Sequence, residues 1–288
     1  MTDTAYDPRI TPARPDLAAA HLAGQVKAER FVAGETFTVR AAIAPLRPEP
    51  STDAVQVSEL LIGHRLTVYE TKDGWAWGQV GHDHYVGYVN AEALAPATAA
   101  PTHRVRALAS HMYAEPDLKS RPLLRISMGS RLCLDPAGAE NGFFPVADGG
   151  WIFARHVTPK DRPEPDAVAT AVRLIGVPYL WGGASSFGLD CSGLVQLVLA
   201  MAGIEVARDS DQQARSIGAP VAPIPAPGSL RRGDLVFFPG HVGIMRDAHR
   251  LIHANARAMM VSCEPLAEVI ARIARTETQP LTTVRRLD

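Results

Sequence analysis

One cysteine has a position in the sequence that suits a nucleophile, because it begins a predicted helix. Asp190 precedes Cys191 and is placed to cap that helix. A thiol at the positive end of a helix dipole has its thiolate stabilised, and the N–H groups there can bind an oxyanion. A buried structural cysteine is the alternative, which helix position alone does not exclude. The helix is predicted from apolar residues at helical spacing after Cys191, namely Leu194, Val195, Val198 and Leu199.

Two histidines on neighbouring predicted strands favour the catalytic interpretation. His241 begins a strand and shares a face with Gly243, which leaves room for a helix to come close. His253 lies on the next strand. Two imidazoles side by side can act as base and orienting group for a cysteine, whereas a pair of structural strand histidines is the alternative.

The elements that must position these residues form a mixed C-terminal block, residues 162–288. Its helices come first and are followed by an antiparallel meander, which predicts an α+β domain. Helices are predicted at 166–175, 191–202, 209–217 and 266–272, and strands at 235–238, 242–245, 251–254, 259–263 and 282–286.

The part of the chain before this block is rich in short β segments. Residues 1–30 are polar, with a possible short helix around 17–30. Residues 31–97 and 102–159 repeat the same pattern of short strands and turns, which predicts two small barrels that arose by internal duplication. One irregular β domain is the alternative.

The bulk composition is that of a globular protein with two or three domains. Of the 288 residues, 47% are apolar and 20% charged, and the net charge of −1 provides no general attraction to nucleic acid or anionic membrane. The three cysteines have the spacing of neither a disulfide framework nor a zinc site. The first 22 residues lack the basic start and apolar run of a signal peptide, so we expect a cytoplasmic protein with reduced thiols.

Five motifs resemble, in order and spacing, those of the NlpC-type cell-wall cysteine peptidases, which have a papain-like fold. The resemblance implies that Cys191 is the nucleophile, His241 the base and His253 the orienting third residue. It also implies that Tyr179 lies beside the nucleophile and helps to hold the oxyanion. No metal or organic cofactor is implied. The motifs are residues 177–183, 188–195, 232–238, 241–244 and 252–254.

The β blocks resemble the bacterial SH3-like barrels of one subgroup, which cuts between γ-D-glutamate and the diamino acid of murein peptides. The resemblance implies a papain-like α+β peptidase domain preceded by two SH3-like barrels, and substrates with a free N-terminal L-alanine. Such specificity requires a carboxylate for the ammonium. A solvated surface acid is the alternative for Glu59, and a barrel-core aromatic for Tyr85. The implied substrate-binding residues are Asp190, Ser192, Asp209 and Ser210, with Glu59 and Tyr85 from the first barrel.

The leading functional hypothesis is attack of the Cys191 thiolate on the γ-D-glutamyl amide, followed by hydrolysis with His241 as acid and base. The expected substrates are murein tripeptides or longer stem peptides taken up during wall recycling, with no nucleic-acid or membrane partner. An exported hydrolase of intact wall, a non-catalytic murein-peptide binding module and acyl transfer to an amine are alternatives. The sequence leaves open the diamino acid (diaminopimelate or Lys) and the oligomeric state.

Overall fold

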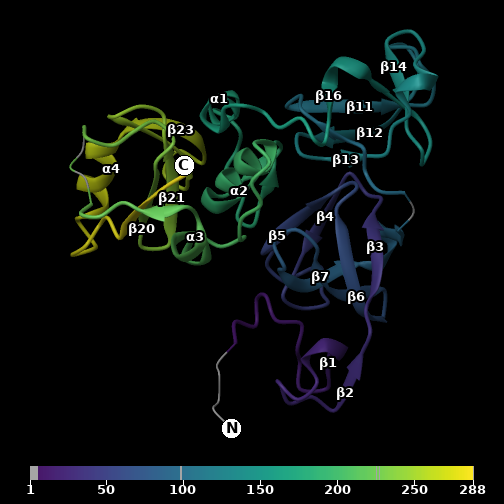
Figure 1. Cartoon of the computed structure of the whole chain (residues 1–288), viewed down its shortest axis with the longest axis horizontal. Helices are drawn as coiled ribbons and strands as arrows, with labels where there is room; N and C mark the ends of the chain where they lie inside the picture. Colours follow the sequence, from purple (N-terminus) through teal and green to yellow (C-terminus); the bar gives the residue numbers. More distant parts are fainter. Residues whose placement is uncertain (1–5, 98, 225, 227, 288) are drawn as a thin grey trace. The chain divides into compact units, whose positions relative to one another are not determined.

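The chain folds into two compact units that meet in the sequence at Lys160 and Asp161 (Figure 1). The computed structural model describes residues 6–97, 99–224, 226 and 228–287. The first unit consists of β structure and short 3-10 turns, and all four α-helices described belong to the second. No helix in the described part of the chain has the length and apolar character needed to cross a membrane.

The N-terminal segment is extended and not helical. Strand β1 (Leu17–Ala19) pairs in parallel with β2 (Arg30–Val32), and a 3-10 turn (Ala20–Leu22) follows β1. The short helix predicted around 17–30 is therefore wrong. All three residues of β1 are buried. In a surface helix, three successive side chains point in different directions, so they could not all be buried against one neighbouring element.

The first β block is built around a five-stranded antiparallel sheet in the order β8-β7-β6-β3-β9. A separate hairpin joins β4 to β5. The apolar core of this first β block includes buried Leu46, Leu60, Leu66 and Val89. The strands are β3 (Glu35–Val39), β4 (Ile43–Leu46), β5 (Ser58–Leu61), β6 (Arg65–Lys72), β7 (Trp75–Val80), β8 (Val86–Asn90) and β9 (Leu94–Pro96), with a 3-10 turn at Ala91–Ala93.

The second β block has strands and a core of its own. Its sheets have the orders β13-β10-β16 and β12-β11-β15-β14, and buried Val105, Ile126 and Ile152 lie in its core. The two β blocks have separate cores within one compact unit, and their assignment as two barrels stays a prediction. The strands are β10 (His103–Val105), β11 (Ala109–Tyr113), β12 (Pro122–Ser127), β13 (Arg131–Leu132), β14 (Phe143–Pro145), β15 (Trp151–Phe153) and β16 (Val157–Pro159), with 3-10 turns at Pro136–Gly138 and Ala154–His156.

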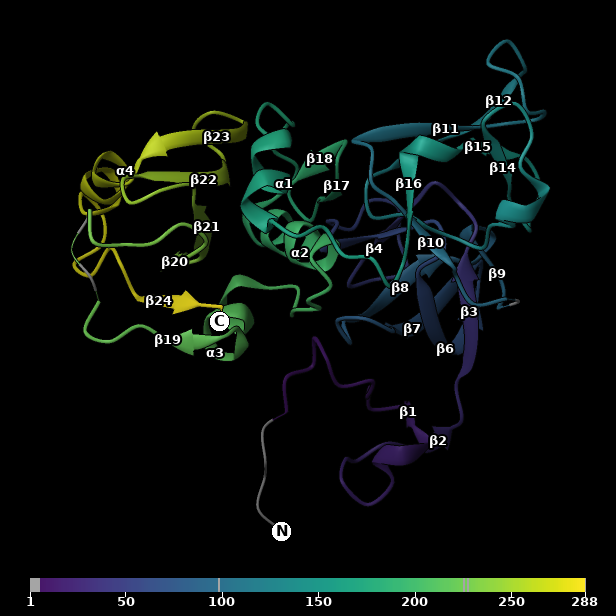
Figure 2. The ribbon, with the colours of Figure 1, turned by 45° about the horizontal axis from the view of Figure 1, so that its top comes forward.

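The second unit contains a six-stranded antiparallel sheet in the order β19-β24-β20-β21-β22-β23 (Figure 2). The predicted strands of this region are confirmed to within two residues at each end. The observed strands are β19 (Ala219–Pro220), β20 (Leu235–Phe238), β21 (His241–Met245), β22 (Arg250–Asn255), β23 (Met260–Pro265) and β24 (Thr283–Arg286). A small hairpin that the sequence pattern did not predict, β17 (Ala184–Ser185) with β18 (Gly188–Leu189), comes directly before α2.

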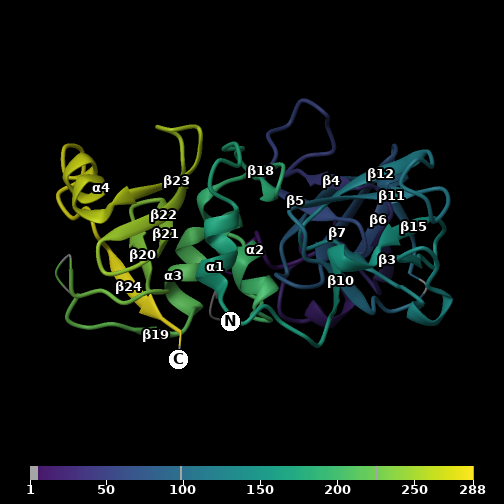
Figure 3. The ribbon, with the colours of Figure 1, turned by 90° about the horizontal axis from the view of Figure 1, so that it is seen from above.

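Helices lie on both sides of this sheet. α1 (Ala167–Arg173) and α2 (Cys191–Met201) lie on one side, where α2 packs on β21 and β22. α4 (Leu266–Ile273) packs beside β23 on the other side of the sheet, as Figure 3 shows. α3 (Ser210–Ser216) contacts α2 and β24. The predicted apolar stripe of α2 is fully buried, which fixes its first turn, and so Cys191, against the sheet.

Candidate active site

The nucleophile candidate lies in the first turn of α2, in a position defined by its neighbours. Asp190 is the N-cap, and its Oδ1 accepts a hydrogen bond of 2.7 Å from the Gly193 N–H, which confirms the predicted cap. A Cβ at Gly193 would lie 2.1 Å from the Gly183 carbonyl oxygen. Only glycine therefore lets this loop approach the start of the helix. Cys191, the first residue of this helix, is buried, with 9% of its surface exposed.

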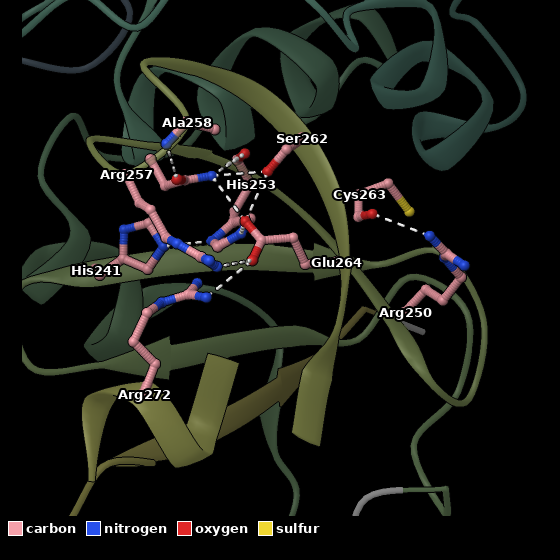
Figure 4. Close-up of polar contacts among 10 residues, drawn as sticks. His241, Arg250, His253, Arg257, Ala258, Ser262, Cys263, Glu264 and Arg272 are labelled. Atoms are coloured by element: carbon pink, nitrogen blue, oxygen red, sulfur yellow. Dashed lines mark hydrogen bonds and ion pairs between the residues drawn. The ribbon is translucent and has the colours of Figure 1, made fainter. Parts of the chain in front are cut away.

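The two histidines form a hydrogen-bonded pair on β21 and β22 (Figure 4). His241 Nε2 and His253 Nδ1 are 2.8 Å apart. Gly243 lies close to the neighbouring strand, because a Cβ there would lie 2.8 Å from Leu251 Cγ and 3.0 Å from the His253 Cβ. The backbone N–H of Val242, next to His241, hydrogen-bonds the Cys191 thiol. The structure therefore brings together the three residues that the sequence predicted as nucleophile, base and orienting group.

A fourth side chain, which the sequence analysis did not identify, continues this line. Glu264 on β23 lies with its Oε1 3.1 Å from His253 Nε2. Ser262 Oγ also donates to Oε1 (2.9 Å), and Arg272 Nη1 of α4 donates to Oε2 (3.0 Å). No local sequence motif reveals Glu264. It could be found only from the register of β22 and β23, which pairs His253 with Ser262, two residues before Glu264.

Burial keeps both the thiol and its base uncharged. It raises the pKa of Cys191 to about 11, aided by the Asp190 carboxylate. It lowers the pKa of His241 to about 3, aided by the neighbouring His253 and Arg272. The free site therefore holds a neutral thiol and a neutral imidazole at neutral pH, in contrast to the thiolate expected from the helix position. A neutral imidazole can accept the proton of a neutral thiol during a reaction, which is the role predicted for His241.

A buried ion pair supports the start of α2. Arg208, with 1% of its surface exposed, binds Asp190 with both terminal nitrogens, at 3.0 and 2.6 Å. Arg208 Nη1 also donates to Ser192 Oγ, which in turn donates to Asp190. The Gly182 N–H donates to Asp190 Oδ2 at 3.0 Å. The predicted ammonium-binding carboxylate is thus an acceptor for five donors, and its role towards substrate stays a prediction.

The other predicted residues of the second unit lie around this pair. Burial, together with the charges of Cys191 and Asp190, raises the pKa of Tyr179 to about 12. The phenol is therefore neutral and can donate a hydrogen bond. Asp209 is the N-cap residue of α3 and Ser210 is its first residue. Gln213 of α3 donates to the Ser192 carbonyl oxygen (3.0 Å), which ties this segment to the start of α2.

The two residues predicted from the first barrel lie in the other unit. Glu59 is on β5 with 7% of its surface exposed, so it is not a solvated surface acid. Tyr85 is 6% exposed and belongs to the apolar core of the first barrel, as the alternative interpretation held. Their contribution to substrate binding stays a prediction from the resemblance.

The described residues contain no cluster of three or more His, Cys, Asp or Glu side chains that could hold a metal ion. Cys133, Cys191 and Cys263 are all free thiols. The hydrogen-bonded pair of His241 and His253, together with a cysteine that begins α2, supports nucleophilic attack by sulfur with an imidazole as acid and base.

Comparison with known proteins finds a match in each of the two units. Residues 176–276 match the NlpC/P60 family, and residues 46–94 match the bacterial dipeptidyl-peptidase SH3 domain. The dipeptidyl-peptidase 6 of Lysinibacillus sphaericus is 27% identical over 80% of this chain and 91% of its own length. The gamma-D-glutamyl-L-lysine dipeptidyl-peptidase of Bacillus subtilis is 30% identical over 46% of this chain and 47% of its own.

A solved structure supports the same assignment at the level of the fold. The crystal structure of an NlpC/P60 family protein from Bacillus cereus superposes with a TM-score of 0.73 at 22% identity, covering 88% of this chain and 99% of the other. The fold and the site agree with the two sequence matches. The protein is thus a cysteine peptidase whose papain-like NlpC/P60 domain is preceded in the chain by a bacterial dipeptidyl-peptidase SH3 domain.

Proposed function

We propose that this peptidase hydrolyses the γ-D-glutamyl–diamino acid bond of murein (peptidoglycan) peptides that carry a free N-terminal L-alanine. The observation that carries the chemistry is the 2.8 Å contact between His241 and His253 beside the helix that begins with Cys191. The names of both relatives support a dipeptidyl-peptidase reaction, and that of the Bacillus subtilis relative supports the γ-D-glutamyl bond.

The reaction begins at the Cys191 sulfur. His241 takes the thiol proton as Sγ attacks the γ-carbonyl carbon of D-glutamate, and the N–H groups at the start of α2 and the Tyr179 hydroxyl stabilise the oxyanion. The C–N bond breaks as protonated His241 donates to the leaving amine of the diamino acid. Water, deprotonated by His241, then cleaves the thioester and releases the dipeptide with its new γ-carboxylate.

The first test concerns the nucleophile. Cys191→Ala should abolish release of the diamino acid from L-Ala-γ-D-Glu-diaminopimelate, because no other group in the site can form the thioester. Peptide affinity, measured by calorimetry, should stay within about two-fold of the parent protein. Cys133→Ala removes a free thiol of the other unit and serves as the matched control. Equal turnover by the Cys191 variant contradicts the proposal.

The second test concerns the free amine. An ammonium bound by a carboxylate in a partly buried site contributes a strong charge-assisted hydrogen bond. N-acetylation of the alanine should therefore lower kcat/KM by at least about 100-fold. Asp190 is our principal candidate for this contact, with Ser192, Asp209 and Ser210 near it, and Glu59 and Tyr85 as further candidates. Equal rates on free and acetylated peptides contradict recognition of the amino end and leave the peptidase chemistry intact.

We further propose that the substrates are soluble peptides released from the wall and that the enzyme works in the cytoplasm. The three free thiols support a reducing compartment. Incubation with intact sacculi and with soluble stem peptides distinguishes a cytoplasmic recycling enzyme from an exported wall hydrolase. A recycling enzyme should cleave only the soluble peptides. Efficient release from sacculi favours the exported hydrolase instead.

A further inference from the structure

The side chain that completes the line Cys191, His241, His253 is an anchored carboxylate. Glu264 Oε1 accepts hydrogen bonds from Ser262 Oγ and Asn255 Nδ2, at 2.9 and 3.3 Å, and faces His253 Nε2 at 3.1 Å. Its Oε2 accepts from Arg272 Nη1 and lies 3.5 Å from Arg257 Nη1 (Figure 4). These partners come from β22, β23, α4 and the turn between the two strands, so the carboxylate cannot move without disturbing several elements.

The identity of its neighbours keeps this carboxylate ionised. Two guanidinium groups face Oε2, and two neutral donors face Oε1. Although burial opposes ionisation, the hydrogen bonds from Ser262, Arg272 and His253 hold the pKa of Glu264 below its ordinary value. An ionised carboxylate can only accept hydrogen bonds.

An acceptor at this position determines where the protons of both imidazoles lie. His253 Nε2 must carry a hydrogen to bond with Glu264. In the neutral ring, His253 Nδ1 is then the acceptor, so His241 Nε2 must carry the hydrogen of their 2.8 Å contact. Neutral His241 consequently has a lone pair on Nδ1, the nitrogen that remains available to take the thiol proton.

We propose that Glu264 is a positioning residue of the peptidase, which fixes the tautomers of His253 and His241 so that His241 Nδ1 is the base. A reversed tautomer of His253 would donate from Nδ1, turn His241 Nε2 into the acceptor and place the proton on His241 Nδ1. That state cannot accept the Cys191 proton. Because burial keeps both imidazoles neutral in the free enzyme, their tautomers decide whether the site can act.

The same carboxylate also acts when His241 becomes charged. Proton transfer from Cys191 creates an imidazolium whose Nε2–H donates to His253, and His253 in turn donates to Glu264. The negative charge at the end of this chain stabilises the imidazolium through two hydrogen bonds. Arg272 and Arg257 partly offset the negative charge of Glu264. The stabilisation of the imidazolium therefore depends on the hydrogen bonds that join Glu264, His253 and His241 as well as on the charge of Glu264.

The test compares Glu264→Gln with Glu268→Gln. Both remove one acidic charge, but Glu268 is exposed on α4 and lies outside the line. The amide that replaces Glu264 can donate as well as accept, so it no longer enforces Nε2–H on His253. We expect kcat to fall by at least about ten-fold with KM within about two-fold, whereas Glu268→Gln should match the parent enzyme.

The decisive measurement is the tautomer of each histidine, read from ¹⁵N chemical shifts at neutral pH. The parent enzyme should show Nε2–H on both His241 and His253, and Glu264→Gln should show a mixture. An unchanged kcat, or unchanged tautomers in the folded variant, overturns the proposal. Because the NMR comparison needs no substrate, it decides the role of Glu264 even if the proposed murein peptide is not cleaved.

Thermal unfolding of the same samples controls for loss of structure. If Glu264→Gln does not fold, Glu264→Asp provides the same comparison. It keeps the charge, but its shorter side chain withdraws the carboxylate from His253 Nε2. We expect a lower kcat and mixed tautomers again, and parent-like values for both contradict the proposal.

Discussion

Cys191 is buried and His241 is partly buried, and burial acts on their pKa values in opposite directions. It raises that of the thiol to about 11 and lowers that of the imidazole to about 3. Each shift favours the neutral form, because removal from water penalises a charge of either sign. The helix N-terminus and Arg208 counteract the shift of Cys191 without reversing it. The site is thus prepared for proton transfer during attack.

This protonation state predicts how Cys191 reacts with a small alkylating agent. Below its pKa the thiolate fraction grows about ten-fold per pH unit, so iodoacetamide labelling should accelerate about ten-fold per unit between about pH 7 and 10. Peptide mass spectrometry separates labelling of Cys191 from that of the other two cysteines. In urea the rate should level off near the ordinary thiol pKa of about 8.5. A labelling rate that is already constant above about pH 6 in the folded enzyme contradicts this prediction and indicates a thiolate–imidazolium ion pair.

At the scale of elements, the start of α2 depends on close contact with the preceding loop. Gly193 donates to Asp190, and its Cα lies so near Gly183 that no side chain fits between them. Gly182 donates to the same carboxylate. The loop, the N-cap and the first helical turn therefore form one rigid piece, and the nucleophile belongs to it.

Gly193→Ala tests this packing. A Cβ would lie 2.1 Å from the Gly183 oxygen, so the loop or the helix must shift. We expect a loss of about 1–3 kcal/mol in the free energy of unfolding, despite the better helix propensity of alanine. Urea unfolding provides the measurement, and kcat should fall as Cys191 moves.

A matched substitution separates this clash from the general effect of adding a methyl group. In Gly81→Ala the nearest atom would be 3.5 Å from the new Cβ, which is an ordinary contact. Its unfolding free energy should stay within about 0.5 kcal/mol of the parent. Equal stability of the two alanine variants contradicts the packing argument.

The elements of the second unit were largely predictable, because their periodicities are local. Helix α2 and strands β20 to β22 follow from apolar spacing within ten or so residues. The contacts of Arg208 and Glu264 were not predictable in this way. They join residues 18 and 11 positions apart in the sequence, and they depend on the path of a loop and on strand register. The predicted N-terminal helix was wrong because Leu17, Ala18 and Ala19 all have high helix propensity, whereas burial in the folded protein places them in a strand.

At the scale of the whole molecule, the residues proposed for catalysis all belong to one unit. The hydrogen bonds described above for the site join residues between Gly182 and Arg272, all of which follow residue 160. The second unit also has its own apolar core around Val236, Leu251 and Val284. The first unit has separate cores in its two β blocks.

We therefore predict that residues 161–288 fold when expressed alone. A unit with its own core should show a cooperative thermal transition. Scanning calorimetry of the fragments 1–160 and 161–288 provides the measurement, and the ¹⁵N shifts of His241 and His253 should match those of the full chain. A fragment 161–288 without a cooperative transition contradicts this division.

The position of β24 has a consequence for how the enzyme is made. This strand, Thr283–Arg286, pairs with β20 in the middle of the sheet, and Arg286 neutralises the buried Asp234 with bonds of 2.6 and 2.7 Å. During synthesis, β20, β21 and α2 leave the ribosome before β24 does. A nascent chain stalled before residue 283 has an open sheet edge, and its Asp234 lacks the Arg286 guanidinium while keeping the Arg231 N–H. Peptidase activity should thus arise late in translation, after the nucleophile and both histidines have already emerged.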